Sequence, residues 1–207
     1  MEVRIDELVF SKKDVEDLGI RVGDYISFDP RVRVYENGYV KSRHLDDKAS
    51  VAALFGLLEL MVKQNLTPVH TVKLFITNYE EVGHGAAYIP ADISELIAVD
   101  MGALGDDLSG SERDVSICAK DSSGPYDYKM TSKMVELAEL LQIGHAVDIY
   151  PQYGSDGSAA LRGGRDIRAA LIGPGVHASH SMERTHIDSV LNTAALLAAY
   201  ILDPADR

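Results

Sequence analysis

The chain has 207 residues, of which 46% are hydrophobic and 25% are charged, an ordinary composition for a globular protein with one sizeable core. Its formal net charge of −12 argues against nucleic acid or an anionic membrane surface as a partner. No stretch reaches the roughly 18 apolar residues of a membrane span, and the first seven residues are not typical of a signal peptide, so we expect a cytoplasmic protein.

Residues 1–43 have a different pattern from the rest of the chain. Short alternating apolar runs at residues 3–5, 25–28, 32–34 and 39–40, separated by glycine and proline, indicate small β-strands. One helix is possible from Ser11, as its cap, to Leu18. The segment has too few apolar residues to close a domain alone.

From Leu45 onward, strands are expected to alternate with helices. The first helix should bury one stripe, made of Val51, Leu54, Phe55, Leu58, Met61 and Val62. Apolar runs predict strands at 72–77, 96–99, 115–119, 146–150 and 167–172, and helices at 130–141, after Ser155 and at 190–201. Cys118, the only cysteine, excludes a disulfide framework and is expected in the core. This alternation predicts an α/β fold with a mixed, mostly parallel sheet covered on both faces.

Two adjacent carboxylates, Glu80 and Glu81, follow the expected strand at 72–77, and glycines follow them at once. A lone Glu-Glu pair would favour a solvated acidic turn. Other acidic or histidine residues, however, stand at strand ends or helix starts: Asp46, Asp100, Asp156 and His180. Sites in open α/β sheets form outside the carboxyl ends of the strands, so these side chains are expected to converge.

A hydrolase with two metal ions needs several carboxylate and histidine side chains of this kind in one place. One carboxylate bridges both ions, one or two further nitrogen or oxygen ligands hold each ion, and a free carboxylate takes a proton from the bridging water. Zinc accepts aspartate, glutamate and histidine as ligands. The sequence therefore predicts a co-catalytic metal centre.

The ordered motifs Leu45-Asp46-Asp47-Lys48, Glu80-Glu81-Val82-Gly83, Val99-Asp100-Met101-Gly102 and His180-Ser181-Met182-Glu183 resemble the glutamyl aminopeptidase family, which includes the tetrahedral, dodecameric peptidases. The resemblance covers residues 19–202. It implies a three-layer α/β/α metallopeptidase domain at residues 44–207. It also implies that residues 1–43 are the end of an inserted, β-rich dimerisation domain. A homo-oligomer, either a dimer or a dodecamer, and peptide substrates are the implied partners.

Carried over onto these motifs, the resemblance implies that Asp46 bridges the two ions, Asp100 binds the first, and Glu81 and His180 bind the second. Glu80 would be the general base that acts on the bridging water. The implied cofactors are two divalent metal ions, with zinc favoured and cobalt or manganese as alternatives. Asp47 follows the bridging position and is not assigned to metal.

Some histidine and polar positions leave alternatives open. Members of the family carry an early His-x-Asp motif, and its histidine completes the first metal site. No such motif precedes Arg43 in this sequence. We therefore expect one tightly bound metal ion and a weak second site. His44 would face the same way as Asp46 on a strand, but it is a weak candidate ligand. His177 and His186 could lie near the site or in exposed loops, and Asp156 could lie there or cap a helix. Arg184 could bind substrate or form a surface salt bridge.

The leading hypothesis is a metal-dependent aminopeptidase that removes N-terminal residues from peptides, with Glu80 as general base. One alternative is a related zinc amidohydrolase, such as a deacylase of acyl-amino acids. The other is a catalytically incomplete homologue that only binds or assembles, because one histidine ligand is absent.

Overall fold

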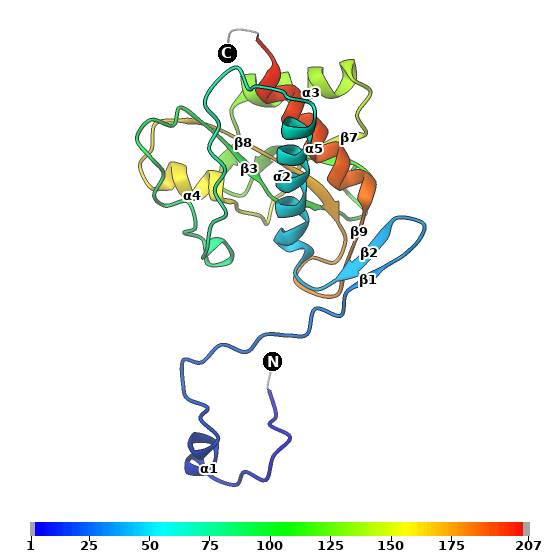
Figure 1. Cartoon of the computed structure of the whole chain (residues 1–207). Helices are drawn as coiled ribbons and strands as arrows, with labels where there is room; N and C mark the ends of the chain where they lie inside the picture. Colours follow the sequence, from blue (N-terminus) through cyan, green and yellow to red (C-terminus); the bar gives the residue numbers. More distant parts are fainter. Residues whose placement is uncertain (1–2, 205–207) are drawn as a thin grey trace.

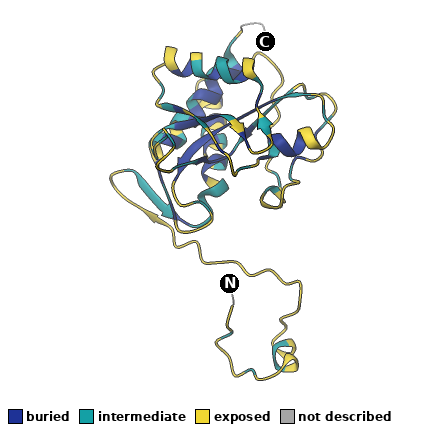
Figure 2. Cartoon of the chain, turned by 180° about the vertical axis from the view of Figure 1, so that it is seen from behind, coloured by how far each residue is buried: buried dark blue, intermediate teal, exposed yellow. Residues whose placement is uncertain are grey.

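The computed structural model describes residues 3–204, and its body begins near β1 (Arg33–Val34), while the preceding arm extends away from it (Figure 1). Helix α1 (Lys12–Asp17) lies in the arm, capped as expected by Ser11, whose Oγ accepts from Asp14 N at 3.2 Å. The strands expected at 3–5 and 25–28 are absent, so that prediction is wrong. These residues are largely exposed (Figure 2) and have no partner strand in the described part of the chain, and an isolated strand is not stable in water.

A six-stranded mixed sheet forms the centre of the body, in the order β3-β8-β5-β6, with β4 beside β8 and β7 beside β5. Strand β8 is parallel to β3 and β4 but antiparallel to β5, and β5 is parallel to β7. The prediction of a mixed sheet is confirmed. The strands are β3 (Glu95–Val99), β4 (Gly102–Ala103), β5 (Val115–Asp121), β6 (Gly124–Pro125), β7 (His145–Ile149) and β8 (Arg168–Val176).

Helices cover the two faces of this sheet, which confirms the α/β/α architecture. The helices are α2 (Leu45–Lys63), α3 (Tyr128–Leu140), α4 (Asp156–Arg162) and α5 (Ile187–Leu202). Alternate residues of β8 separate the layers: Ile172 packs in the large core with α2, α3 and α5, whereas Leu171 packs in a second cluster on the other face. Helix α4 lies on that other face, where Gly157 approaches Ala98 of β3. No helix among residues 3–204 is long and apolar enough to cross a membrane.

The buried face of α2 differs from the stripe expected from the sequence. Its buried residues are Ala49, Ser50, Ala53, Leu57 and Met61, whereas Phe55 and Val62 are 62% and 79% exposed. The small side chains on the buried face allow α2 to approach α5 closely. The expected stripe is therefore wrong at Phe55, Leu58 and Val62, although Met61 is buried as expected. Both faces of this helix carry apolar residues, and the face with the smaller side chains packs against the core.

The strand expected at residues 72–77 is also absent, and this prediction is wrong. The segment is extended and runs outside the sheet, to the left of α2 in Figure 1. Its apolar residues Val72, Leu74, Phe75 and Ile76 are between 37% and 59% exposed. A strand needs a neighbour for its backbone, and within residues 3–204 no backbone hydrogen bond joins residues 70–77 to another segment.

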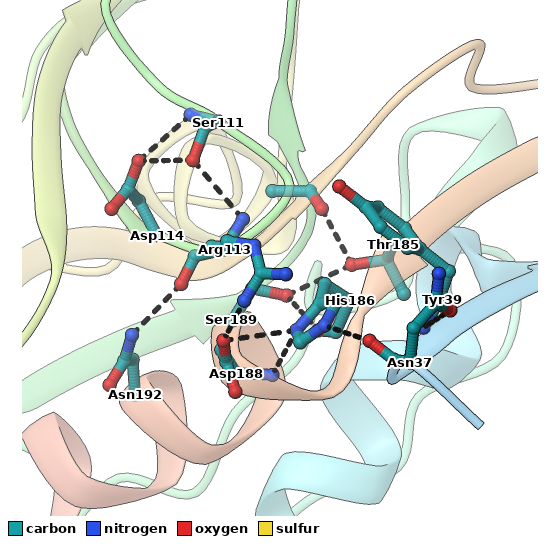
Figure 3. Close-up of polar contacts among 11 residues, drawn as sticks. Asn37, Tyr39, Ser111, Arg113, Asp114, Thr185, His186, Asp188, Ser189 and Asn192 are labelled. Carbon is teal, nitrogen blue, oxygen red and sulfur yellow. Dashed lines mark hydrogen bonds and ion pairs between the residues drawn. The ribbon is translucent and has the colours of Figure 1, made fainter. Parts of the chain in front are cut away.

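A second, three-stranded sheet joins the arm to the body. Strand β2 (Tyr39–Ser42) pairs antiparallel with both β1 and β9 (Glu183–His186). His186 was a candidate exposed-loop residue, but it is buried and caps α5, because its Nδ1 accepts from Asp188 N at 3.1 Å. Its Nε2 donates to the carbonyl of Asn37 at 2.8 Å, as Figure 3 shows. This histidine therefore ties the hairpin to the last helix.

Candidate metal centre

Three side chains from distant parts of the chain meet at one point. Asp46 stands at the start of α2, Glu81 in the short 3-10 helix Glu80–Val82, and His180 in the loop before β9. The His180 Nε2 lies 3.2 Å from Asp46 Oδ2 and 3.2 Å from Glu81 Oε2. One nitrogen and two carboxylate oxygens within 4.8 Å of one another can hold a zinc ion.

A second group uses the same Asp46. Ligand atoms of Asp46, Asp47 and Asp100 also lie within 4.8 Å of one another. Asp100 follows the parallel strand β3, and its amide donates to Ile172 O of β8 at 3.0 Å. Asp46 is thus common to both groups, and its side chain is only 8% exposed. A carboxylate shared by two neighbouring ligand groups is the arrangement that a two-metal site requires.

The carboxyl groups of Asp47 and Asp100 are buried and lie close to other negative charges. Burial, then the charge of Asp46 nearby, raises the pKa of Asp100 well above its usual value. Burial, then Asp100, raises the pKa of Asp47 to about 10. Oδ1 of Asp47 is buried without a hydrogen-bond partner among the described groups. Crowded, partly unsatisfied carboxyl oxygens of this kind fit a bound cation, which would relieve both the repulsion and the lost hydration.

Glu80 lies beside both groups without belonging to either. Burial, followed by the charges of Glu81, Asp156 and Asp46, raises the pKa of Glu80 to about 7. Together with Asp46, Glu81, Asp100 and His180 it lines a cavity of about 420 Å³. A half-buried carboxylate with a pKa near neutrality can accept a proton from water at neutral pH.

Asp156 holds the loop that carries Glu80 and Glu81 through two hydrogen bonds. Its Oδ2 accepts from Thr77 Oγ1 at 2.6 Å and its Oδ1 from Ala86 N at 2.8 Å. Asp156 does not cap α4, as one interpretation had it, because Ser155 is the cap and accepts from Gly157 N. Asp156 instead holds both ends of the Glu80–Glu81 loop.

Glu183 is one of two residues near the site that sequence reasoning missed. It is 1% exposed, and its carboxylate accepts hydrogen bonds from the backbone amides of Leu45, Asp46 and His180. It therefore fixes the backbone of two ligand-bearing segments at once. The only signal was its place in the motif His180-Ser181-Met182-Glu183, three residues after the histidine. Ser179 was also missed, and its Oγ donates to Asp46 Oδ2 at 2.5 Å.

The remaining candidates lie outside both groups. His44 belongs to neither, and its Nε2 lies 3.4 Å from Phe28 O. His177 is exposed and pairs through its backbone with Arg184. The Arg184 side chain forms an ion pair with Glu112 and lies over the Tyr39 ring. This geometry favours the salt-bridge interpretation of Arg184 over a role in substrate binding.

Comparison with known proteins identifies the family. The model of the M42 glutamyl aminopeptidases matches residues 1–196. The chain belongs to the M42 glutamyl aminopeptidase family. A putative aminopeptidase of Bacillus subtilis, YhfE, is 51% identical over 205 residues, which are 99% of this chain and 59% of that protein. The chain thus spans about three-fifths of this curated relative.

Solved structures show the same fold. A TET aminopeptidase from a marine sediment archaeon of the Thaumarchaeota has a TM-score of 0.84 and 19% identity, over 94% of this chain and 57% of that one. The TET1 peptidase of Pyrococcus horikoshii, which can assemble into a tetrahedron or a large octahedral shell, has a TM-score of 0.76 and 23% identity. That match covers 93% of this M42 chain and 58% of the archaeal one. These likenesses confirm the zinc-peptidase-like α/β/α fold.

Proposed function

We propose that this M42 chain carries the catalytic residues of a metal-dependent aminopeptidase. The observation that carries the proposal is the position of Asp46, whose carboxylate belongs to two ligand groups at once. Family membership supports the reaction type. The domain boundary near residue 43 stays part of this proposal, with residues 1–43 as the end of a β-rich insert.

The donor sets fit two cations of different character. Asp46, Glu81 and His180 would hold one ion, and their nitrogen and oxygen donors suit zinc. Asp46 and Asp100, with Asp47 in reach, offer only carboxylate oxygens, which suit a harder cation such as manganese. Such ions would polarise a substrate carbonyl and lower the pKa of a bound water.

The residues of the chain would transfer the proton, bind the peptide N-terminus and hold the site in place. Glu80, whose pKa lies near 7, would take the proton from the attacking water and hand it to the departing amine. The carboxylates around the 420 Å³ cavity would attract the protonated N-terminus of a peptide. Asp156 and Glu183 would hold the catalytic loop and the ligand backbone in place.

A panel of p-nitroanilides with added zinc, cobalt or manganese tests this proposal. Free-amine aminoacyl substrates should be cleaved, and the same substrates with an acylated amine should not. Cleavage of acylated substrates alone would assign a deacylase instead. If neither class is cleaved even when the protein holds metal, the chain acts as a binding or assembly subunit.

We also propose that the protein assembles as a homo-oligomer. The arm at residues 3–32 exposes apolar side chains, among them Leu8, Phe10 and Tyr25, each at least 87% exposed. The assembled shell of the Pyrococcus horikoshii relative supports the same expectation. Sedimentation velocity should show species larger than one chain, and a monomer across micromolar concentrations would contradict this.

A further inference from the structure

Tyr153 lies beside Asp100, the candidate ligand of the second metal ion. Both residues line the cavity of about 420 Å³. The Tyr153 hydroxyl donates to the carbonyl oxygen of Met101, the residue after Asp100, at 2.6 Å. Burial raises the pKa of Asp100, and a hydrogen bond between its carboxylate and the Tyr153 side chain acts in the opposite direction. The hydroxyl therefore lies within reach of two acceptors, the Met101 carbonyl and the Asp100 carboxylate.

The Tyr153 hydroxyl has a single proton, so it can donate to only one of these acceptors at a time. A hydrogen bond to an ionised carboxylate is stronger than one to a neutral carbonyl. A carboxylate must be ionised to bind a metal ion. When Asp100 binds a cation, we therefore expect the hydroxyl proton to point at its carboxylate.

Both the backbone and the ring of Tyr153 are held in place. The backbone carbonyl accepts from Ser122 N at 3.1 Å and also from Ser122 Oγ. The centroid of the ring lies 5.1 Å from that of Tyr150, and the ring packs against the buried cluster that contains Leu171. A side chain fixed by packing and hydrogen bonds in this way can in turn fix the carboxylate that it contacts.

We propose that Tyr153 is a positioning residue that orients the Asp100 carboxylate toward the second metal ion. The inference rests on the proposed metal centre, because Asp100 is one of its candidate ligands. Oδ1 of Asp100 accepts from Met101 N at 2.7 Å, and the Tyr153 hydroxyl would supply the further contact that fixes the carboxylate plane. Loss of a hydrogen-bonded group behind a metal ligand typically lowers the metal affinity by about 10–100-fold.

The variant Tyr153→Phe tests the inference, because it removes the hydroxyl and keeps the ring. One equivalent of zinc fills the site of Asp46, Glu81 and His180, and a manganese titration followed by electron paramagnetic resonance then measures binding at the second site. We expect the dissociation constant for manganese to rise by about 10–100-fold in Tyr153→Phe, while the tightly bound zinc is retained. Circular dichroism checks that the variant is folded.

Tyr150→Phe is the matched control, because Tyr150 belongs to the same cluster but its hydroxyl forms a hydrogen bond with Ser116. This control should bind manganese as the wild-type protein does. Unchanged manganese binding in Tyr153→Phe, an equal loss in both variants, or loss of the zinc ion from Tyr153→Phe would overturn the inference and leave the metal centre standing. A wild-type protein that binds no manganese would instead overturn the proposed second site, and the inference with it.

Discussion

Glu80 and Glu81 are adjacent in the chain but lie in different surroundings. Glu81 contacts His180 and belongs to a ligand group with Asp46, whereas Glu80 lines the cavity and belongs to no such group. Two neighbouring carboxylates can therefore take the two different roles, metal ligand and general base, that the proposed reaction requires.

Glutamine substitution should separate these roles. Glu80→Gln is expected to keep the metal but lower the aminopeptidase rate by roughly 10²–10⁴-fold, because the proton acceptor is lost. Glu81→Gln should weaken metal binding at one site. Metal content by mass spectrometry and the rate on a free-amine substrate check both. Loss of metal from Glu80→Gln, with full metal retained in Glu81→Gln, would reverse the assignment.

The raised pKa values predict how the metal-free protein responds to pH. The pKa of Glu80 is about 7 in the folded chain, above the usual value near 4.5, so the folded state binds more protons than the unfolded state between these values. The free energy of unfolding should therefore fall as pH rises from about 5 to 7. Thermal melts with a chelator should show a lower melting temperature at pH 8 than at pH 5.5.

The variant Glu80→Gln, which cannot titrate at this position, should reduce this pH dependence, while the raised pKa values of Asp47 and Asp100 preserve part of it. Glu59→Gln is the matched control, because Glu59 is exposed on α2, pairs with Lys63 and lies away from the cavity. A melting temperature that rises between pH 5.5 and pH 8, or an equal effect of the two substitutions, would contradict the account.

At the scale of elements, the close packing of two strand ends positions the candidate ligand Asp100. Gly173 of β8 lies against the end of β3, and an ideal Cβ there would stand 1.8 Å from the carbonyl oxygen of Asp100. Only a residue without a side chain allows the two strand ends to approach so closely. The glycine thus fixes where Asp100 enters the second ligand group.

Gly173→Ala should consequently be strongly destabilising, at or beyond the roughly 1–3 kcal/mol typical of overpacking, and should displace Asp100. Gly105→Ala is the control, since a Cβ there meets nothing within 4 Å. Chemical denaturation compares the free energies of unfolding of the two variants. Equal stabilities for Gly173→Ala and Gly105→Ala would contradict the packing argument.

The elements that were predicted correctly from the sequence differ from the others in having neighbouring elements to pack against. Strands β3, β5, β7 and β8 and helices α3, α4 and α5 lie close to their predicted positions, because their apolar patterns match neighbours that are present. The run at 72–77 has an equally good strand pattern but no neighbouring strand within residues 3–204. In α2 the apolar pattern did not reveal that small residues such as Ala53 would face the core.

For the whole molecule, the convergence of the site followed from the order of the motifs along an α/β chain. The structure brings Asp46, Glu81 and His180 together, and Asp46 with Asp100, while their roles as ligands stay predictions. Sequence could not reveal Glu183, because a glutamate in a loop is usually solvated and only the fold shows it buried against three backbone amides.

The number of metal ions held by each chain tests the central claim most directly. Native mass spectrometry after mild dialysis against zinc should show one tightly bound ion per chain, at the site of Asp46, Glu81 and His180, and a second ion that is lost easily. Asp46→Asn should lose both ions, because the carboxylate is common to both groups. Two ions that survive dialysis, no bound ion at all, or full retention of metal by Asp46→Asn would contradict the account.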